Sequence, residues 1–175
     1  MNVYLLRHGI AEAYDPARFP DDSQRPLGAR GHEQMAAVAQ AMRRLDLAID
    51  IIWTSPLVRT RQTAAAVATG LASDRRVHEV EHLAPDGDPR ALMAELAGLD
   101  PRPANVLLVG HEPCLSGLLS VLASGGSAMQ AKFKKGALAK LQLTGPIRFG
   151  QCATLLWLLP PNLLMRLNQA RLAIG

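Results

Sequence analysis

The sequence predicts an α/β protein, a single-domain three-layer αβα sandwich around a mostly parallel central sheet. Short apolar runs typical of buried strands alternate along the chain with segments whose apolar residues recur at helical spacing. Such alternation is typical of parallel strands joined by crossover helices that cover both faces of a sheet. The length of 175 residues suits one domain at about 150 residues per domain. We therefore expect one unit over residues 1–175.

The elements of the first half follow from this pattern in order. Val3–Leu6 is a short apolar run typical of a strand buried between two layers. A polar, proline-containing loop follows, and apolar residues then recur at helical spacing over Ala29–Leu45. Ile49–Trp53 is rich in β-branched residues and indicates a second buried strand. Thr54-Ser55-Pro56 is typical of a helix start, a cap residue followed by proline in the first turn, and this helix is expected to reach about Leu71.

The second half continues the alternation. Asn105–Val109 is the clearest buried strand of the chain; Gly110 ends it, and Pro113 begins another helix that runs through Leu122. The remaining expected elements, in chain order, are a strand at Val77–Val80, a helix at Arg90–Leu99, strands at Ala137–Leu143 and Ala153–Leu159, and a tail helix at Asn162–Leu172.

The composition excludes several classes of protein. With 49% hydrophobic and 19% charged residues, the chain is neither collagen-like nor disordered nor a small disulfide scaffold. The apolar run Ala153–Leu159 stops at Pro160, far short of the roughly 20 residues that a membrane span needs. Two cysteines do not make a disulfide framework, and the N-terminus has no basic leader. These features predict a cytoplasmic protein without a membrane partner, and we expect a monomer.

The net charge of +4 fits an ordinary basic surface, because the arginines are scattered rather than clustered. Lys132, Lys134 and Lys135 form the one dense basic run, and Phe133 is the only aromatic residue within it. Nucleic-acid binding usually combines positive charge with several stacking aromatics, so we expect no nucleic-acid partner. The role of the remaining basic charge stays open.

Three polar segments follow predicted strands directly. Arg7-His8-Gly9 follows the first strand, a segment from Thr54 to Arg59 follows the second, and Gly110-His111 follows the strand at Asn105–Val109. In an open α/β sheet, ligands bind outside the carboxyl ends of the strands. Two histidines and two arginines are therefore expected at one edge of the sheet.

This set of side chains suits a phosphoryl group. The transition state of phosphoryl transfer spreads negative charge over three equatorial oxygens, so fixed positive donors stabilise it. Arg7 and Arg59 can each present a planar fork of N–H groups, and helix N-termini after Pro56 and Pro113 would add backbone amides. One histidine, neutral at the attacking nitrogen, can act as nucleophile, while the other stays protonated and binds the transferred group. The arrangement requires no metal and no cofactor.

Taken together, these motifs resemble the histidine phosphatase superfamily, whose fold is the phosphoglycerate-mutase-like fold. The resemblance lies in three blocks in the same order: Leu5-Leu6-Arg7-His8-Gly9, the block from Ser55 to Thr63, and Val109-Gly110-His111-Glu112-Pro113. Within the superfamily the chain looks most like SixA-type phosphohistidine phosphatases, through Arg25-Pro26-Leu27, the segment from Leu83 to Asp88 and its short length.

The resemblance implies a role for individual residues. His8 would be the phosphorylated nucleophile, and Arg7, Arg59 and His111 would form the phosphate pocket. Apart from the resemblance, two roles stay open for Arg25: it reaches the pocket from the first loop and binds substrate, or it lies on the surface. Ile10 and Ala11 replace the polar residues that sugar-phosphate mutases carry, and Gly28 stands where the SixA-type pattern has threonine.

No residue matches the position at which many family members carry a glutamate as general acid. Glu81, His82 and Asp86 lie in the corresponding region, and the open alternatives are one of these three residues or no general acid at all. An alcohol leaving group needs a proton donor, whereas the imidazole of a phosphohistidine can already carry the proton. We therefore expect a protein phosphohistidine as substrate, handled through a covalent phospho-His8 intermediate.

Other functions share parts of the pattern. A small-molecule phosphomonoesterase of the same superfamily would use the same mechanism, and a non-catalytic phosphate-binding or phosphoprotein-binding module would use the same pocket. His78-Glu79-Val80-Glu81-His82 matches the zinc-protease pattern, but that chemistry needs a helix, and here the residues favour a strand. Cys114 lies at an expected helix start, a position that can lower the pKa of a thiol.

Overall fold

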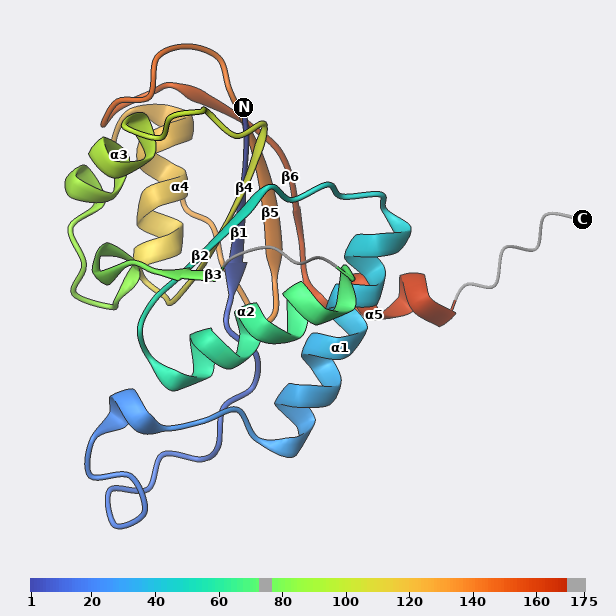
Figure 1. The fold of residues 1–175 in the computed structure, drawn as a ribbon. Helices are drawn as coiled ribbons and strands as arrows, with labels where there is room; N and C mark the ends of the chain where they lie inside the picture. The colour runs from blue at the N-terminus through green and yellow to red at the C-terminus, as the bar shows by residue number, and fades with distance from the viewer. Residues whose placement is uncertain (73–76, 170–175) are drawn as a thin grey trace, which may run out of the picture.

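A six-stranded mixed sheet forms the centre of the molecule, which confirms the α/β class (Figure 1). The computed structural model describes residues 1–72 and 77–169. The strand order is β3-β2-β4-β1-β5-β6; β1 to β4 run parallel, and β5 and β6 are antiparallel to their neighbours. The strands are β1 Asn2–Arg7, β2 Ile51–Thr54, β3 Val77–Glu79, β4 Asn105–Gly110, β5 Leu138–Leu143 and β6 Ala153–Leu159.

Helices cover both faces of the sheet, as the alternation of elements predicted (Figure 1). One face carries α1 Ala29–Arg44, α2 Val58–Gly70 and α5 Pro161–Gln169, and the other carries α3 Pro89–Ala97 and α4 Cys114–Ser124. Two short 3₁₀ helices, η1 Asp22–Gln24 and η2 Glu81–Leu83, lie in the connections. Among the residues that the structure describes, no helix combines the length and apolar character that a membrane crossing needs.

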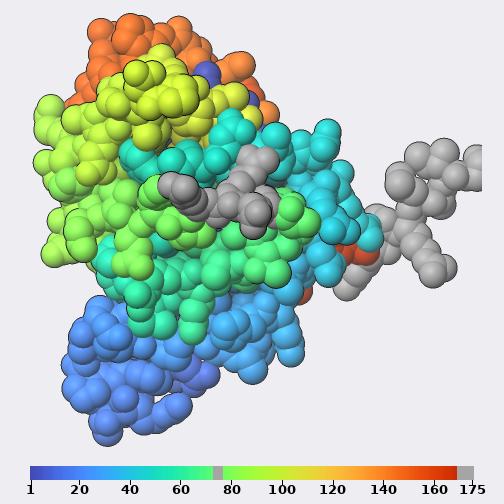
Figure 2. Space-filling model, viewed as in Figure 1, coloured from blue at the N-terminus to red at the C-terminus, as the bar shows by residue number. Residues whose placement is uncertain are grey.

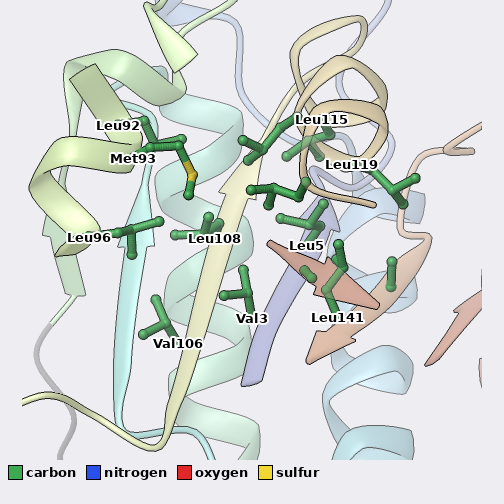
Figure 3. Close-up of a cluster of buried hydrophobic side chains, with 14 of the residues drawn as sticks. Val3, Leu5, Leu92, Met93, Leu96, Val106, Leu108, Leu115, Leu119 and Leu141 are labelled. Atoms are coloured by element: carbon green, nitrogen blue, oxygen red, sulfur yellow. The ribbon is translucent and has the colours of Figure 1, made fainter. Parts of the chain in front are cut away.

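Each central strand contributes side chains to both layers because successive residues point to opposite faces. In β1, Val3 and Leu5 pack into the cluster under α3 and α4, whereas Tyr4 and Leu6 pack into the cluster under α1, α2 and α5. Figure 3 shows the first cluster, in which Leu108 of the sheet lies between the α3 and α4 side chains. Strands that are buried on both faces have continuous apolar runs in the sequence, and such runs predicted β1 and β4.

Most predicted boundaries agree with the structure, and the exceptions lie around β2. This strand begins at Ile51 rather than Ile49, and the helix expected to start at Thr54-Ser55-Pro56 begins only at Val58. The Ser55 amide donates to the Val109 carbonyl at 3.0 Å, so Ser55 continues the pairing with β4 instead of capping a helix. The predicted tail helix begins at Pro161, and its expected end at Leu172 lies outside the described residues.

A long loop leaves the carboxyl end of β1 and lies beyond the strand ends, where Figure 1 draws it in blue below the sheet. It protrudes from the lower end of the surface in Figure 2. The loop is closed at its base by an antiparallel bridge between Ala11 and Leu27, and the Gly28 amide donates to the Ile10 carbonyl at 3.0 Å. Gly31, in the first turn of α1, lets the same Ile10 carbonyl approach, because a Cβ there would collide with it.

The Gly31→Ala variant tests this close approach. Alanine is the better helix former by about 1 kcal/mol, yet we expect Gly31→Ala to destabilise the protein by roughly 1–3 kcal/mol, because its methyl group forces Ile10 away. Gly117→Ala is the matched control: it lies within α4, a Cβ there meets nothing within 4 Å, and we expect it to be neutral or stabilising. Urea unfolding monitored by circular dichroism measures both, and equal effects of the two substitutions would contradict the prediction.

Candidate active site

Strand register brings the three predicted segments to one edge of the sheet. Arg7 pairs with Gly110 across β1 and β4, and Thr54 pairs with Val109 across β2 and β4. The His8 amide extends this ladder by donating to the Gly110 carbonyl at 3.1 Å. The two imidazole rings that follow these strands face each other with centroids 5.1 Å apart and planes inclined by 54°. The carboxyl-end rule therefore placed both histidines correctly.

His8 is held in the form that a nucleophile needs. Its Nδ1–H donates to the Gly9 carbonyl at 2.7 Å, so Nε2 carries no proton in the neutral ring and keeps a free lone pair. Burial above all, together with the positive charges of Arg59, Arg7 and Lys135, lowers the pKa of His8 to about 3, although the bond to Gly9 acts in the opposite direction. With 6% of its surface exposed, the ring is neutral at physiological pH.

His111 is anchored by a residue of the second segment. Its Nε2 and the Ser55 Oγ share a hydrogen bond of 2.9 Å, and both residues are buried. Burial, followed by the neighbouring charges of His8, Arg59 and Arg7, lowers the pKa of His111 to about 3. His111 is therefore neutral at physiological pH under these charges alone, and its protonation beside a transferred phosphoryl group stays a prediction. An anion in the pocket has the opposite effect, because a negative charge favours the imidazolium form.

Arg7 and Arg59 lie on either side of this pair, at the end of β1 and in the first turn of α2. One Arg7 NH group donates to the Phe133 carbonyl at 2.7 Å, and one Arg59 NH group donates to the Asp22 carbonyl at 2.8 Å. Within the described part of the chain, the Nε of each arginine is buried and has no hydrogen-bond partner. An unsatisfied buried donor is unfavourable, so both guanidinium groups are suited to an oxyanion acceptor. Burial lowers the pKa of both, but guanidinium groups stay protonated.

Asp22, in the loop, joins two of the arginines. Its carboxylate binds Arg59 at 3.1 Å and Arg25 at 2.7 Å, and Arg25 also donates to the Glu12 carbonyl at 2.9 Å. These bonds, that from Arg25 above all, keep the pKa of Asp22 below its usual range, so this carboxyl is ionised. Arg25 therefore lies beside Arg59, but its role in substrate binding stays a prediction.

Backbone and hydroxyl bonds fix the positions of His8 and Arg59 relative to each other. The amide of Gly9 donates to the Thr63 Oγ1 at 3.1 Å, and that hydroxyl donates to the Arg59 carbonyl at 2.7 Å. Gly9 also needs its small size, since a Cβ there would come within 2.8 Å of the Met35 Cγ. The loop after β1 and the helix after β2 thus form one rigid frame.

Three residues of the site escaped the sequence reasoning, namely Ser55, Asp22 and Lys135. Ser55 was interpreted as a helix cap, and Asp22 stood in a loop without periodicity. Lys135 was one of three lysines in a basic run, yet its charge is among those that lower the pKa of His8. No local pattern marked Lys135: it lies beside the site because β5 runs antiparallel to β1, so that the residues before β5 lie where β1 ends.

The other residues singled out in the sequence do not join this cluster. Glu81 and Asp86 are exposed, and neither they nor His82 are among the main causes of the pKa shifts of His8 and His111. His78 lies in the strand β3, which removes the helix that a zinc protease needs. No group of three His, Cys, Asp or Glu side chains within residues 1–72 and 77–169 is placed to hold a metal ion. The pKa of Cys114 is raised by burial and by Glu112, so the helix start does not lower it.

Binding of an oxyanion tests the electrostatics of His111. We expect saturating inorganic phosphate at pH 7 to protonate His111, because the added negative charge raises a pKa that burial holds at about 3. Histidine NMR resonances measure this, with the exposed His78 as internal control. A His111 resonance that stays at the neutral position while phosphate binds would contradict the prediction.

Comparisons with known proteins agree with this geometry. The sequence model of the histidine phosphatase superfamily (branch 1) matches residues 3–88. An uncharacterized protein of Picosynechococcus sp. is 36% identical over 145 residues, which cover 81% of this chain and 85% of that protein. A protein named "Probable phosphoglycerate mutase GpmB" from Escherichia coli O1:K1 / APEC is 38% identical over 74 residues; this match covers 42% of the chain and only 34% of the relative.

Solved structures extend the similarity over nearly the whole chain. The protein histidine phosphatase SixA, complexed with tungstate, superposes with a TM-score of 0.82 at 27% identity, covering 94% of this chain and 99% of that one. The alpha-ribazole phosphatase from Shigella flexneri shares the fold, with a TM-score of 0.64 at 21% identity over 92% of this chain and 97% of its own. Sequence blocks, fold and site geometry lead to one assignment: the chain belongs to the histidine phosphatase superfamily.

Proposed function

We propose that the protein is a phosphohistidine phosphatase that removes the phosphoryl group from a histidine of another protein through a covalent phospho-His8 intermediate. The observation that carries the proposal is the unprotonated Nε2 of His8, set by the bond from Nδ1 to the Gly9 carbonyl. Around it lie Arg7, Arg59 and His111, the donors that a transferred phosphoryl group needs. The similarity to SixA supports the choice of substrate.

The reaction proceeds in two displacements. In the first, the lone pair of His8 Nε2 forms a bond to phosphorus while the bond from phosphorus to the substrate imidazole breaks, and its electron pair stays on that imidazole nitrogen. The substrate ring leaves as neutral imidazole when its other nitrogen carries a proton. In the second, a water oxygen attacks phosphorus, the bond to Nε2 breaks, and inorganic phosphate leaves with the water's protons shared between it and solvent. Arg7 and Arg59 stabilise the oxygens in both steps.

The carboxylate that binds Arg25 and Arg59 supports an imidazole leaving group over an alcohol. Asp22 is ionised, because its bonds to Arg25 and Arg59 keep its pKa low, so it holds no proton to donate. An alkoxide leaves poorly without a proton donor, whereas a protonated phosphoimidazole leaves as a neutral ring. A small-molecule phosphomonoesterase remains the second candidate, since the alpha-ribazole phosphatase shares the fold.

Trapping of the intermediate tests the mechanism. We expect a phosphohistidine-bearing protein labelled with ³²P to transfer acid-labile, base-stable label to His8 after rapid quenching. His8→Ala removes the nucleophile and should lower kcat by at least about 10⁴-fold, whereas His78→Gln, an exposed histidine of β3, should keep wild-type activity. If the wild-type protein binds phosphate but shows no turnover, the proposal is contradicted and the protein is a binding module.

A substrate panel tests the choice of leaving group. We expect kcat/KM for a phosphorylated histidine domain to exceed that for sugar phosphates by at least about 10²-fold, which is the usual contribution of the general acid that sugar phosphates need. The substrate p-nitrophenyl phosphate, whose leaving group needs no proton, should be hydrolysed as a control. Efficient turnover of sugar phosphates with none on the histidine domain would establish the phosphomonoesterase instead.

A further inference from the structure

The segment from Phe133 to Ala137 wraps around the end of β1. The Phe133 carbonyl accepts from Arg7, and the Gly136 amide donates to the Arg7 and His8 carbonyls at 3.1 and 3.2 Å. Gly136 has a φ of +82°, and a Cβ there would press on Met35 and Gln34, which makes this turn depend on glycine. The backbone of the segment is therefore fixed against the two residues at the centre of the site.

Lys135 lies in the middle of this turn, and its backbone, like that of its neighbours, is held by hydrogen bonds. Its carbonyl accepts from Gln34 Nε2 at 2.8 Å, and the other end of that amide, Oε1, accepts from the Ile10 amide at 3.1 Å. Gln34 thus ties the turn before β5 to the loop after His8. The backbone from which the Lys135 side chain extends is therefore held beside Arg7 and His8.

The three lysines of the basic run differ in their surroundings. Lys132 and Lys134 are exposed, whereas Lys135 is half-buried. Burial, then the charges of Arg7, Arg25 and Arg59, lower the pKa of Lys135. Its side chain therefore lies within electrostatic range of all three arginines and of His8.

Lys135 also differs from those arginines in having no acceptor. Arg7 binds the Phe133 carbonyl, while Arg25 and Arg59 bind Asp22. Among the residues that the structure describes, the Lys135 ammonium group makes no hydrogen bond and no ion pair. A partly buried cation placed among like charges without a counter-ion is unfavourable unless an anion joins the cluster.

The charge balance indicates which anion this is. The three arginines and Lys135 carry four positive charges, and two carboxylates, those of Asp22 and Glu112, lie near them. The charge of Glu112 raises the pKa of Arg7, and its carboxylate accepts a hydrogen bond from the Ser116 amide at 3.2 Å. Two positive charges remain in excess, and a phosphoryl group carries about two negative charges at neutral pH. We propose that Lys135 is a further substrate-binding residue, whose ammonium group contacts the oxygens of the transferred phosphoryl group beside Arg7 and Arg59.

This inference rests on the proposed function and is tested by Lys135→Met, which keeps the length of the side chain and removes its charge. We expect kcat/KM to fall about 10²-fold, and by the same factor for a phosphohistidine protein and for p-nitrophenyl phosphate, since the contact is to the phosphoryl group that both share. The inhibition constant of orthovanadate should rise at least tenfold. Lys135→Arg restores the charge and should stay within about tenfold of wild type in kcat/KM.

Lys134→Met is the matched control, because it removes the same charge from the exposed neighbour and should change neither quantity by more than about twofold. Melting temperatures of all variants measure the integrity of the fold. Three results would overturn the assignment: a Lys135→Met enzyme within threefold of wild type, a loss confined to one of the two substrates, or an arginine variant as poor as the methionine variant at an unchanged melting temperature.

The test separates this inference from the proposed function. Labelling of His8 in the wild-type protein tests the proposed function whatever the role of Lys135. If no label appears on His8, the phosphohistidine mechanism itself is refuted. Labelling of His8 together with a fully active Lys135→Met variant refutes only the role of Lys135.

Discussion

The pairing of β1 with β4 is the constraint on which the site depends. Arg7 lies opposite Gly110, and the hydrogen bond from the His8 amide to the Gly110 carbonyl carries the ladder one residue past the end of β1. Because the register of parallel strands is fixed by the apolar residues buried on both faces, a slip of one residue would turn the β1 side chains to the wrong layers. The same packing that stabilises the core therefore sets the distance between the two imidazole rings. The sheet, rather than the loops, therefore determines where the two histidine side chains lie.

The electrostatics of the site are unfavourable in the absence of an anion. Two neutral imidazoles with pKa values near 3 are surrounded by three arginines and a lysine, and two of the arginines bury an Nε without an acceptor. In the ligand-free protein this arrangement opposes stability, and only the rigid backbone around it maintains it. An anion reverses the balance, since it satisfies donors, offsets repulsion and favours protonation of His111 at once. Preorganised donors of this kind are the main source of stabilisation for phosphoryl transition states.

The sequence predicted the fold and part of the site for identifiable reasons. β1 and β4 are buried on both faces and stand out as apolar runs, and the carboxyl-end rule then brings Arg7, His8, Arg59 and His111 to one edge. Lys135 was missed because that rule concerns strands that end at the edge, whereas β5 begins there. Ser55 was missed because its cap-like sequence hid the continued pairing of β2. The lowered pKa of His111 was missed because burial depends on tertiary packing, which no local pattern reports.

The bond between Asp22 and Arg59 has a consequence for how tightly a ligand is held. A free arginine side chain loses roughly 2 kcal/mol of rotamer entropy when it becomes ordered. In this protein Asp22 accepts from Arg59 through both its carbonyl and its carboxylate, and the side chain of Arg59 is only 6% exposed. The guanidinium group is thus immobilised before any substrate arrives, so the entropy of fixing it belongs to the folding of the chain and not to the binding step. In this way Asp22, a loop residue that need not touch the substrate, contributes to the affinity for the ligand.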